Sequence, residues 1–185
     1  MMIVGFFEDP LYAWLYPDAD ERHDALRDTF RLMLSGGINN GQVLIDDSNS
    51  ALAIWTAPGH ELLEESDMQT FVSSLHERLG ERAQSALDGM QACSSLAPPQ
   101  PHATVHSIVV RPKARGTGIG GALLASVLRR CDDAGWTVAL ESSNPRNLEF
   151  YRRAGFRIAG EVTLADGGPT MWPMERRPMD AAIDR

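Results

Sequence analysis

A glycine-rich loop between a predicted strand and a predicted helix constrains the fold more than any other feature of the sequence. The β-branched segment Thr104–Val110 predicts a strand, and the segment from Gly116 to Ala134 predicts a helix that Gly135 ends. The four glycines of the loop leave backbone N–H groups unshielded by side chains. Together with the positive end of the helix dipole, these groups are typical of a site for a pyrophosphate.

The charge around the loop agrees with an anion site. From Arg111 to Arg130 the sequence has five basic residues and no acidic one, although the chain of 185 residues has a formal net charge of −8. A second strand, Trp136–Glu141, follows the helix, so this part of the sheet is predicted to be parallel. The alternative interpretation of the loop is a turn that only packs a helix tightly against a sheet.

The other segments predict a mixed sheet flanked by helices. Helical periodicity covers Phe6–Ser35, with a break at Tyr16-Pro17-Asp18 and an end at Gly36-Gly37, and covers Ser66–Ser94, with a break at Gly80. The remaining predicted elements are the short helix Asn147–Ala154 and the strands Gln42–Ile45, Ala51–Thr56, Phe156–Leu164 and Thr170–Arg176. We therefore expect one α/β (α+β) domain over residues 1–185, with a twisted mixed sheet of about six strands.

Composition excludes several classes of protein. A pI near 5.0 argues against nucleic-acid binding, which favours a basic surface. The apolar runs are far shorter than the roughly 20 residues that span a bilayer, and the N-terminus lacks the basic region of a signal peptide. Cys93 and Cys131 belong to no CxxC or Cys/His cluster, so they predict buried thiols and no metal site. These features predict a cytoplasmic protein.

A dinucleotide-binding site is one alternative interpretation of the loop. Gly116, Gly118 and Gly121 fit the GxGxxG fingerprint, and Glu141 lies twenty residues beyond Gly121. This reading predicts an NAD-dependent oxidoreductase. Two features count against it: residues 111–115 separate the strand from the first glycine, and only 44 residues follow Glu141.

Two sequence blocks resemble the coenzyme A motifs of the GCN5-related N-acetyltransferase (GNAT) superfamily. Val110-Arg111-Pro112 and Arg115–Gly120 are similar to its V-x-P entry followed by (Q/R)-x-x-G-x-(G/A), and Asn144–Phe156 is similar to its N…Y-x-x-x-G-F block. Other segments resemble the puromycin N-acetyltransferase-like branch, namely Asp9-Pro10, Trp14, Tyr16-Pro17-Asp18, Trp55 with Pro58-Gly59, and Gly168–Met174.

The resemblance implies an acyl-CoA N-acyltransferase fold whose sheet is splayed between the strands that end at Val110 and Glu141. The chain begins at about the first helix of that fold, so either its first strand is missing or the start of the sequence has been set too late. The implied activity is the transfer of an acetyl group from acetyl-CoA to a primary amine of a small molecule, directly and in a ternary complex. An exposed sheet edge left by the missing strand would favour a homodimer.

The resemblance also implies the roles of individual residues. The backbone of Val109 and Val110 would bind the pantetheine arm, with the Val110 N–H donating to the thioester carbonyl. Tyr151 would be the general acid, since a phenol with a pKa near 10 can protonate a departing thiolate. Asn144 would contact the cofactor arm, unless it only caps the following helix. The phosphates would lie on the backbone amides of a loop that Arg115 opens: Gly116, Thr117, Gly118, Ile119, Gly120 and Gly121.

The general base is left open by the sequence. Glu141 ends a strand beside the expected splay, so its carboxylate can receive the amine proton directly or through water, and a solvated acid at a strand end is the alternative. His106 is a candidate proton relay or a structural histidine. A module that binds coenzyme A without catalysis is the alternative function from a different class.

Overall fold

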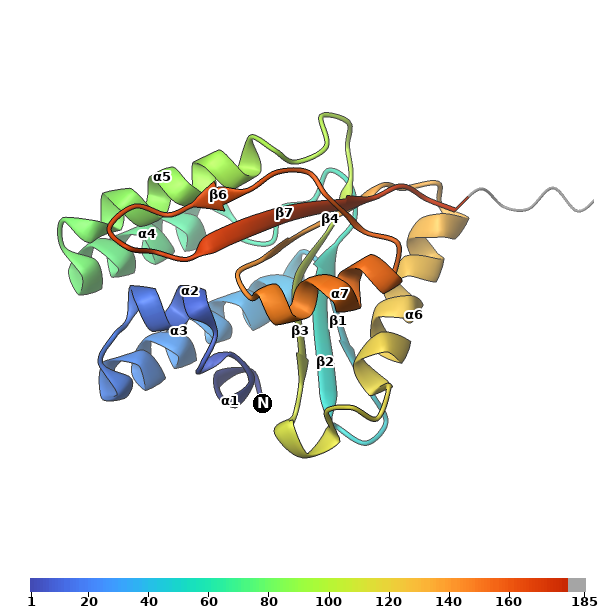
Figure 1. Cartoon of the computed structure of the whole chain (residues 1–185), viewed down its shortest axis with the longest axis horizontal. Helices are drawn as coiled ribbons and strands as arrows, with labels where there is room; N and C mark the ends of the chain where they lie inside the picture. Colours follow the sequence, from blue (N-terminus) through green and yellow to red (C-terminus); the bar gives the residue numbers. More distant parts are fainter. Residues whose placement is uncertain (180–185) are drawn as a thin grey trace, which may run out of the picture.

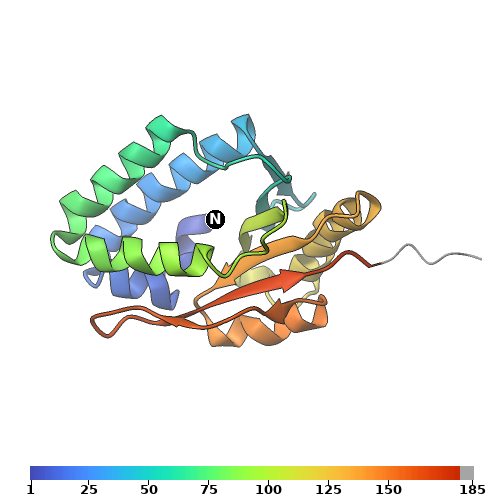
Figure 2. The same cartoon turned by 90° about the horizontal axis from the view of Figure 1, so that it is seen from above.

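The computed structural model describes residues 1–179, which form a mixed sheet with helices on both faces (Figures 1 and 2). The helices are α1 (Met2–Phe6), α2 (Pro10–Leu15), α3 (Ala19–Asn39), α4 (Glu65–Leu79), α5 (Arg82–Ser94), α6 (Ile119–Asp133) and α7 (Pro145–Arg153), with a 3-10 turn at Pro112–Ala114. The strands are β1 (Gln42–Ile45), β2 (Ala51–Thr56), β3 (Ala103–Val110), β4 (Val138–Ser142), β5 (Arg157–Ile158), β6 (Val162–Thr163) and β7 (Thr170–Arg176).

The order of the strands confirms the predicted mixed sheet. It runs β1-β2-β3-β4-β7-β5, with β6 also paired to β7. Only β3 and β4 are parallel within the described chain, and the other pairs are antiparallel. The predicted strand Phe156–Leu164 is split into β5 and β6, because it runs beside Pro173 of β7, which has no N–H to donate.

The predicted splay between β3 and β4 is confirmed. The two strands pair only at their beginnings, where Ala103 faces Val138 and Thr104 faces Ala139. Beyond these pairs, β3 continues along β2 to Val110, while β4 continues along β7. The separation leaves one edge of the outer half of β3 without a strand partner among the described residues.

One predicted boundary is wrong: Gly36-Gly37 does not end the helix, since α3 continues to Asn39. These glycines serve close packing instead of termination. A Cβ on Gly36 would lie 2.2 Å from the Leu62 carbonyl oxygen, and one on Gly37 would lie 2.8 Å from Ile54 Cγ2. The other predicted breaks are present, because Asp18 caps α3 through the amides of Asp20 and Glu21, and Gly80 separates α4 from α5.

The chain before α3 forms two helices, α1 and α2, whereas the sequence predicted one helical piece that starts at Phe6. Phe6 ends α1 instead, and the Asp9 side chain caps a new helix at Pro10. Helix α1 packs on β3 so closely that a Cβ on Gly5 would clash with Val109. On this face, Leu26 and Phe30 of α3 pack with Ile54. On the opposite face, α6 and α7 cover the sheet (Figure 1).

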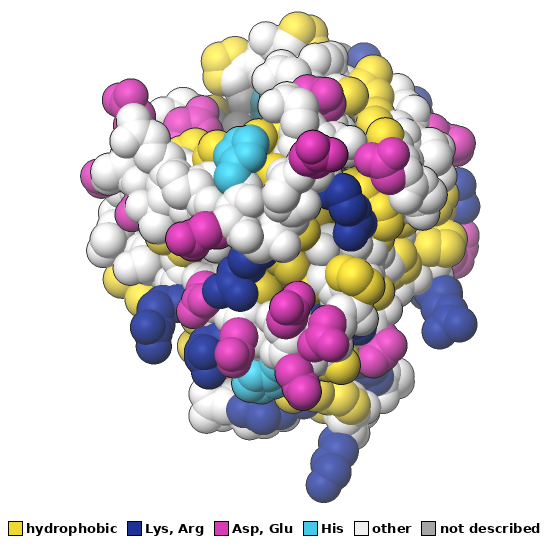
Figure 3. All heavy atoms as spheres, turned by 90° about the vertical axis from the view of Figure 1, so that its left-hand side faces the viewer, with side chains coloured by type: hydrophobic (Ala, Val, Ile, Leu, Met, Phe, Trp, Pro, Cys, Tyr) yellow, Lys and Arg dark blue, Asp and Glu magenta, His cyan; other side chains and the backbone are white. Residues whose placement is uncertain are grey.

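One face of the molecule carries both acidic and basic side chains, and both cysteines lie in the interior. On the side built by α2 to α5, acidic and basic side chains are intermingled around apolar ones (Figure 3). Cys93 and Cys131 are both buried free thiols, as predicted. No helix in residues 1–179 is both long and apolar enough to cross a membrane.

Candidate active site

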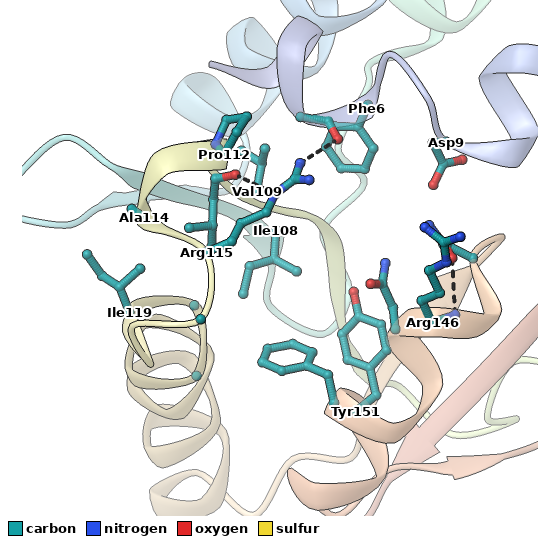
Figure 4. A pocket seen from close by; sticks show the side chains of 18 of the residues that line it. Phe6, Asp9, Ile108, Val109, Pro112, Ala114, Arg115, Ile119, Arg146 and Tyr151 are labelled. Carbon is teal, nitrogen blue, oxygen red and sulfur yellow. Dashed lines mark hydrogen bonds between the residues drawn. The ribbon is translucent and has the colours of Figure 1, made fainter.

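A groove of about 820 Å³ lies beside the splay (Figure 4). Its walls come from three parts of the chain: α1 with the start of α2, the end of β3 with the glycine loop, and α7. All the residues predicted from the cofactor motif lie in these walls or at their edges, except that Thr117 is turned toward Ala114, whose carbonyl its hydroxyl binds at 2.7 Å.

The glycine loop presents unpaired amides at the start of α6. Gly116 and Gly118 have φ of 78° and 85°, left-handed values that glycine adopts without strain. The first helical hydrogen bond runs from the Ala122 amide to the Gly118 carbonyl at 3.0 Å, and no side chain in residues 1–179 caps this end. The amides of residues 119–121 therefore point at the groove with the positive end of a 15-residue helix.

Arginines add positive charge to the same groove. Arg115 spans it from the loop, donating to the carbonyls of Val110 and Gly5 at 3.4 Å each (Figure 4). Arg146 and Arg153 line it from α7. The groove therefore combines backbone donors and guanidinium groups, the two kinds of group that bind phosphates in proteins.

The register of β3 decides which backbone groups face the groove. The Arg111 amide donates to the Ser50 carbonyl at 2.8 Å, toward the β2 side. Because successive amides of a strand point to opposite sides, the Val110 N–H points into the splay and the Val109 N–H points toward β2. Ile108, which the sequence analysis did not select, presents its backbone in the same direction as Val110.

Tyr151 lies on α7 with its hydroxyl pointing into the groove (Figure 4). Its ring packs against Phe150 and Phe156, with centroids 5.1 and 6.0 Å away. Burial, with a smaller effect of Asp9, raises the pKa of Tyr151 to about 12, so the phenol is protonated at neutral pH. Asn144 caps α7 by accepting from the Arg146 amide at 3.1 Å, and it also lines the groove.

A second cavity of about 330 Å³ is lined by residues of α2 to α5 and of the sheet. Glu141 and His106 line it from the two splayed strands. The Glu141 carboxylate opens onto this cavity, but the protein around it removes much of its hydration, which raises its pKa above the ordinary value. Burial lowers the pKa of His106 to about 4, so this ring is neutral at neutral pH.

A bulge in β3 explains where His106 lies. Ile54 pairs with Ser107 and Trp55 pairs with Val105, so His106 has no partner on β2. An extra residue in one strand changes the face that the following side chains occupy. His106 consequently lines the second cavity, where its Nε2 lies 2.9 Å from Thr56 Oγ1.

Asp9 is a residue of the site that the sequence analysis did not assign to chemistry. It caps α2 by accepting from the Leu11 amide at 3.1 Å, and it accepts a second hydrogen bond from the Ser143 hydroxyl. Burial raises its pKa, and its charge contributes to the raised pKa of Tyr151. The Asp9-Pro10 pair indicates a helix start, but its contact with Ser143 comes from the fold.

The groove and the second cavity are lined by neighbouring residues of the chain where β3 and β4 separate. Ile108 lines the groove and His106 lines the cavity, two residues apart on β3. On the other strand, Glu141 lines the cavity and Asn144 lines the groove. The arrangement places an anion-binding groove, an open strand edge, a phenol and a carboxylate around one gap in the sheet. Among residues 1–179, no group of three or more His, Cys, Asp or Glu is placed to hold a metal ion.

A family model for the acetyltransferase (GNAT) family matches residues 53–156, more than half of the chain. The chain belongs to the GNAT acetyltransferase family. Its mixed sheet is the GNAT fold. The matched residues contain the end of β3, the glycine loop and α7, which form most of the groove.

One curated protein and two solved structures are similar to this chain, with different identities and coverages. The chain is 38% identical over 60 residues to an L-methionine sulfoximine/L-methionine sulfone acetyltransferase of Pseudomonas aeruginosa, covering 31% of this chain and about a third (35%) of that protein. A Corynebacterium glutamicum structure described as histone acetyltransferase HPA2 and related acetyltransferase has a TM-score of 0.69 at 22% identity, covering 98% of this GNAT chain and 89% of its own. PH1933 from Pyrococcus horikoshii has a TM-score of 0.58 at 15% identity, covering 96% and 88%.

Proposed function

We propose that this GNAT chain transfers the acetyl group of acetyl-CoA to a primary amine of a small molecule, directly and in a ternary complex, with residues 1–185 acting as one domain. The observation that carries the proposal is a pair of unlike cavities lined by neighbouring residues of the two splayed strands. One is a groove lined by backbone amides and arginines, and the other is a mostly apolar cavity with the Glu141 carboxylate in its lining. Such a pair suits one anionic co-substrate and one amine.

The groove fits acetyl-CoA in its chemistry. The amides of the glycine loop, with Arg115 beside them, would bind the phosphates, and the free edge of β3 would pair with the amide groups of the pantetheine arm. Asn144 would contact the same arm from the start of α7. Bound there, acetyl-CoA would supply an activated acyl thioester.

Three groups would then act on the reacting atoms. The Val110 N–H would donate to the thioester oxygen and stabilise the negative charge that develops on it. Glu141 would receive the proton of the amine, directly or through water. Tyr151 would protonate the departing thiolate; burial keeps the phenol protonated at neutral pH and also makes it a weaker acid than an ordinary tyrosine.

The acceptor class and the branch of the family are parts of the proposal. The puromycin N-acetyltransferase-like segments and the named substrates of the Pseudomonas relative both favour a small molecule over a protein lysine. A coenzyme A sensor without catalysis is the alternative, and the presence of Tyr151 in the groove favours the enzyme. A homodimer and a cytoplasmic location stay predictions of the sequence.

The proposed function is tested by thiol release from acetyl-CoA over a panel of primary amines. We expect release that depends on both the protein and an amine. Without an amine, the intact mass of the protein should be unchanged after incubation with acetyl-CoA, because direct transfer forms no acetyl-enzyme. A stoichiometric mass increase that an amine then removes would contradict direct transfer, and binding without turnover of any amine would favour the sensor.

The proposed role of Glu141 predicts a particular dependence on pH. A base works only when deprotonated, and burial raises the Glu141 pKa above 4.5, so kcat/KM should fall as the pH decreases through a value above the ordinary carboxyl range. Glu141→Gln should lower kcat/KM by about 100-fold and remove this acidic limb. The matched control is Glu149→Gln on the exposed side of α7, which should leave the profile unchanged. A Glu141→Gln profile that keeps the limb would assign the base to another group.

A further inference from the structure

The lining of the second cavity restricts the chemistry of the acceptor. Most of the lining is aliphatic, aromatic or thioether, with Met33, Phe71 and Met90 on its helical walls. None of the described residues that line it is a lysine or an arginine. Its carboxylates are those of Glu141 at the splay and Glu61, and both residues are exposed.

The helices around this cavity do carry arginines, but none of those in the described residues lines it, and three of them are bound elsewhere. Arg22 of α3 donates to three backbone carbonyls, at 2.7 to 3.1 Å. Arg78 of α4 pairs with Asp28 at 2.6 Å, and Arg82 of α5 donates to the Trp14 carbonyl at 2.6 Å while stacking on the Trp14 ring. His106 is held neutral by burial and contacts Thr56, so it adds no positive charge.

These features favour an ammonium group and oppose a carboxylate. A protonated amine gains the attraction of Glu141 at the inner end, and its apolar body replaces water along the walls. A carboxylate on the same molecule would lose its hydration without a cationic partner and would meet two like charges. A free amino acid therefore suits this cavity poorly, although the name of the Pseudomonas relative specifies amino-acid derivatives as the substrates of that protein.

We propose that the acceptor is a primary amine on an apolar alkyl or aryl body that bears no carboxylate, an inference that rests on the proposed function. In the reaction, the amine nitrogen forms a C–N bond to the acetyl carbon and the C–S bond of the thioester breaks. The ammonium first loses one proton through Glu141 to solvent, and the neutral amine that results is the nucleophile. After the C–N bond forms, a second nitrogen proton passes to Glu141, which releases it to solvent. The sulfur takes one proton from Tyr151, and Tyr151 regains a proton from solvent. The products are an N-alkyl acetamide and the free thiol of coenzyme A.

Three amines that share one phenylethyl body test the inference. They are phenethylamine, L-phenylalaninamide, which has a neutral amide in place of the carboxylate, and L-phenylalanine. We expect phenethylamine and phenylalaninamide to exceed phenylalanine in kcat/KM by at least about 100-fold, since an unpaired buried charge costs several kcal/mol and 1.4 kcal/mol is tenfold. The same order should appear in calorimetric binding to the protein saturated with coenzyme A. Equal use of phenylalanine and phenylalaninamide would overturn the inference.

A substitution in the cavity lining tests directly whether the lack of a cationic side chain there disfavours acceptors that bear a carboxylate. Met68 is 46% exposed in the first part of α4 and lines the cavity, so a longer polar side chain is tolerated there. Met68→Arg should raise the kcat/KM for phenylalanine about tenfold relative to phenylalaninamide, whereas the control Met68→Leu should leave the ratio unchanged. An unchanged ratio in Met68→Arg would count against the inference.

Different results would contradict the proposed function and the proposed class of acceptor. Calorimetry with acetyl-CoA alone tests the cofactor groove without any acceptor. If acetyl-CoA binds but none of the three phenylethyl amines binds or reacts, the acceptor inference is wrong and the proposed function stands. If acetyl-CoA does not bind, both are wrong.

Discussion

Replacing Gly118 by aspartate is expected to weaken acetyl-CoA binding by at least about 100-fold. Gly118 has a φ of 85° at the start of α6, and nothing lies within 4 Å of a Cβ built on it, so the new side chain has room to extend. Its carboxylate would stand where the loop amides are proposed to hold phosphates. Like charges in close contact cost several kcal/mol, and 1.4 kcal/mol corresponds to a tenfold change in Kd. Isothermal calorimetry measures the effect.

Two control variants separate charge from backbone strain. Gly118→Asn has the same size and position as the aspartate but no charge, so its Kd should lie much closer to that of the wild type. Gly135→Asp adds the same carboxylate at a glycine with φ 69° and open space beyond its Cα, at the end of α6 that is away from the groove. It should bind normally. Equal losses in Gly118→Asp and Gly118→Asn would assign the defect to the backbone and not to the phosphates.

Tyr151→Phe is expected to lower kcat by about 100- to 1,000-fold with little change in the Kd for acetyl-CoA. The substitution removes the proposed proton donor and keeps the ring between Phe150 and Phe156, so α7 should stay in place. Steady-state thiol release gives kcat, and calorimetry gives Kd. A kcat within about threefold of the wild type would show that the thiolate leaves without a proton from this residue. A large change in Kd or Tm would instead indicate a structural role.

The cofactor loop could be located from the sequence because its chemistry is local. A β-branched run, a set of glycines and a following helix lie within about thirty residues, and their dihedral preferences do not depend on the rest of the chain. The same holds for the break at Tyr16-Pro17-Asp18, where Pro17 and the Asp18 cap act on adjacent residues. Gly36-Gly37 shows the limit of this reasoning, since glycine permits both a helix end and a close contact, and only the position of Leu62 and Ile54 decides between them.

The sequence by itself determined the family resemblance, the order of the elements from β3 onward and the residue types that hold an anion. The tertiary structure decided which backbone groups are free, because the amides of Val109 and Val110 point in opposite directions and only the pairing with β2 assigns each direction. It also decided that Asp9 meets Ser143, which is 134 residues away in the chain. Finally, the structure decided that no lysine or arginine of residues 1–179 lines the second cavity. Arginines are present on α3, α4 and α5, and whether each one faces the cavity or a partner elsewhere depends on helix packing, which no local pattern encodes.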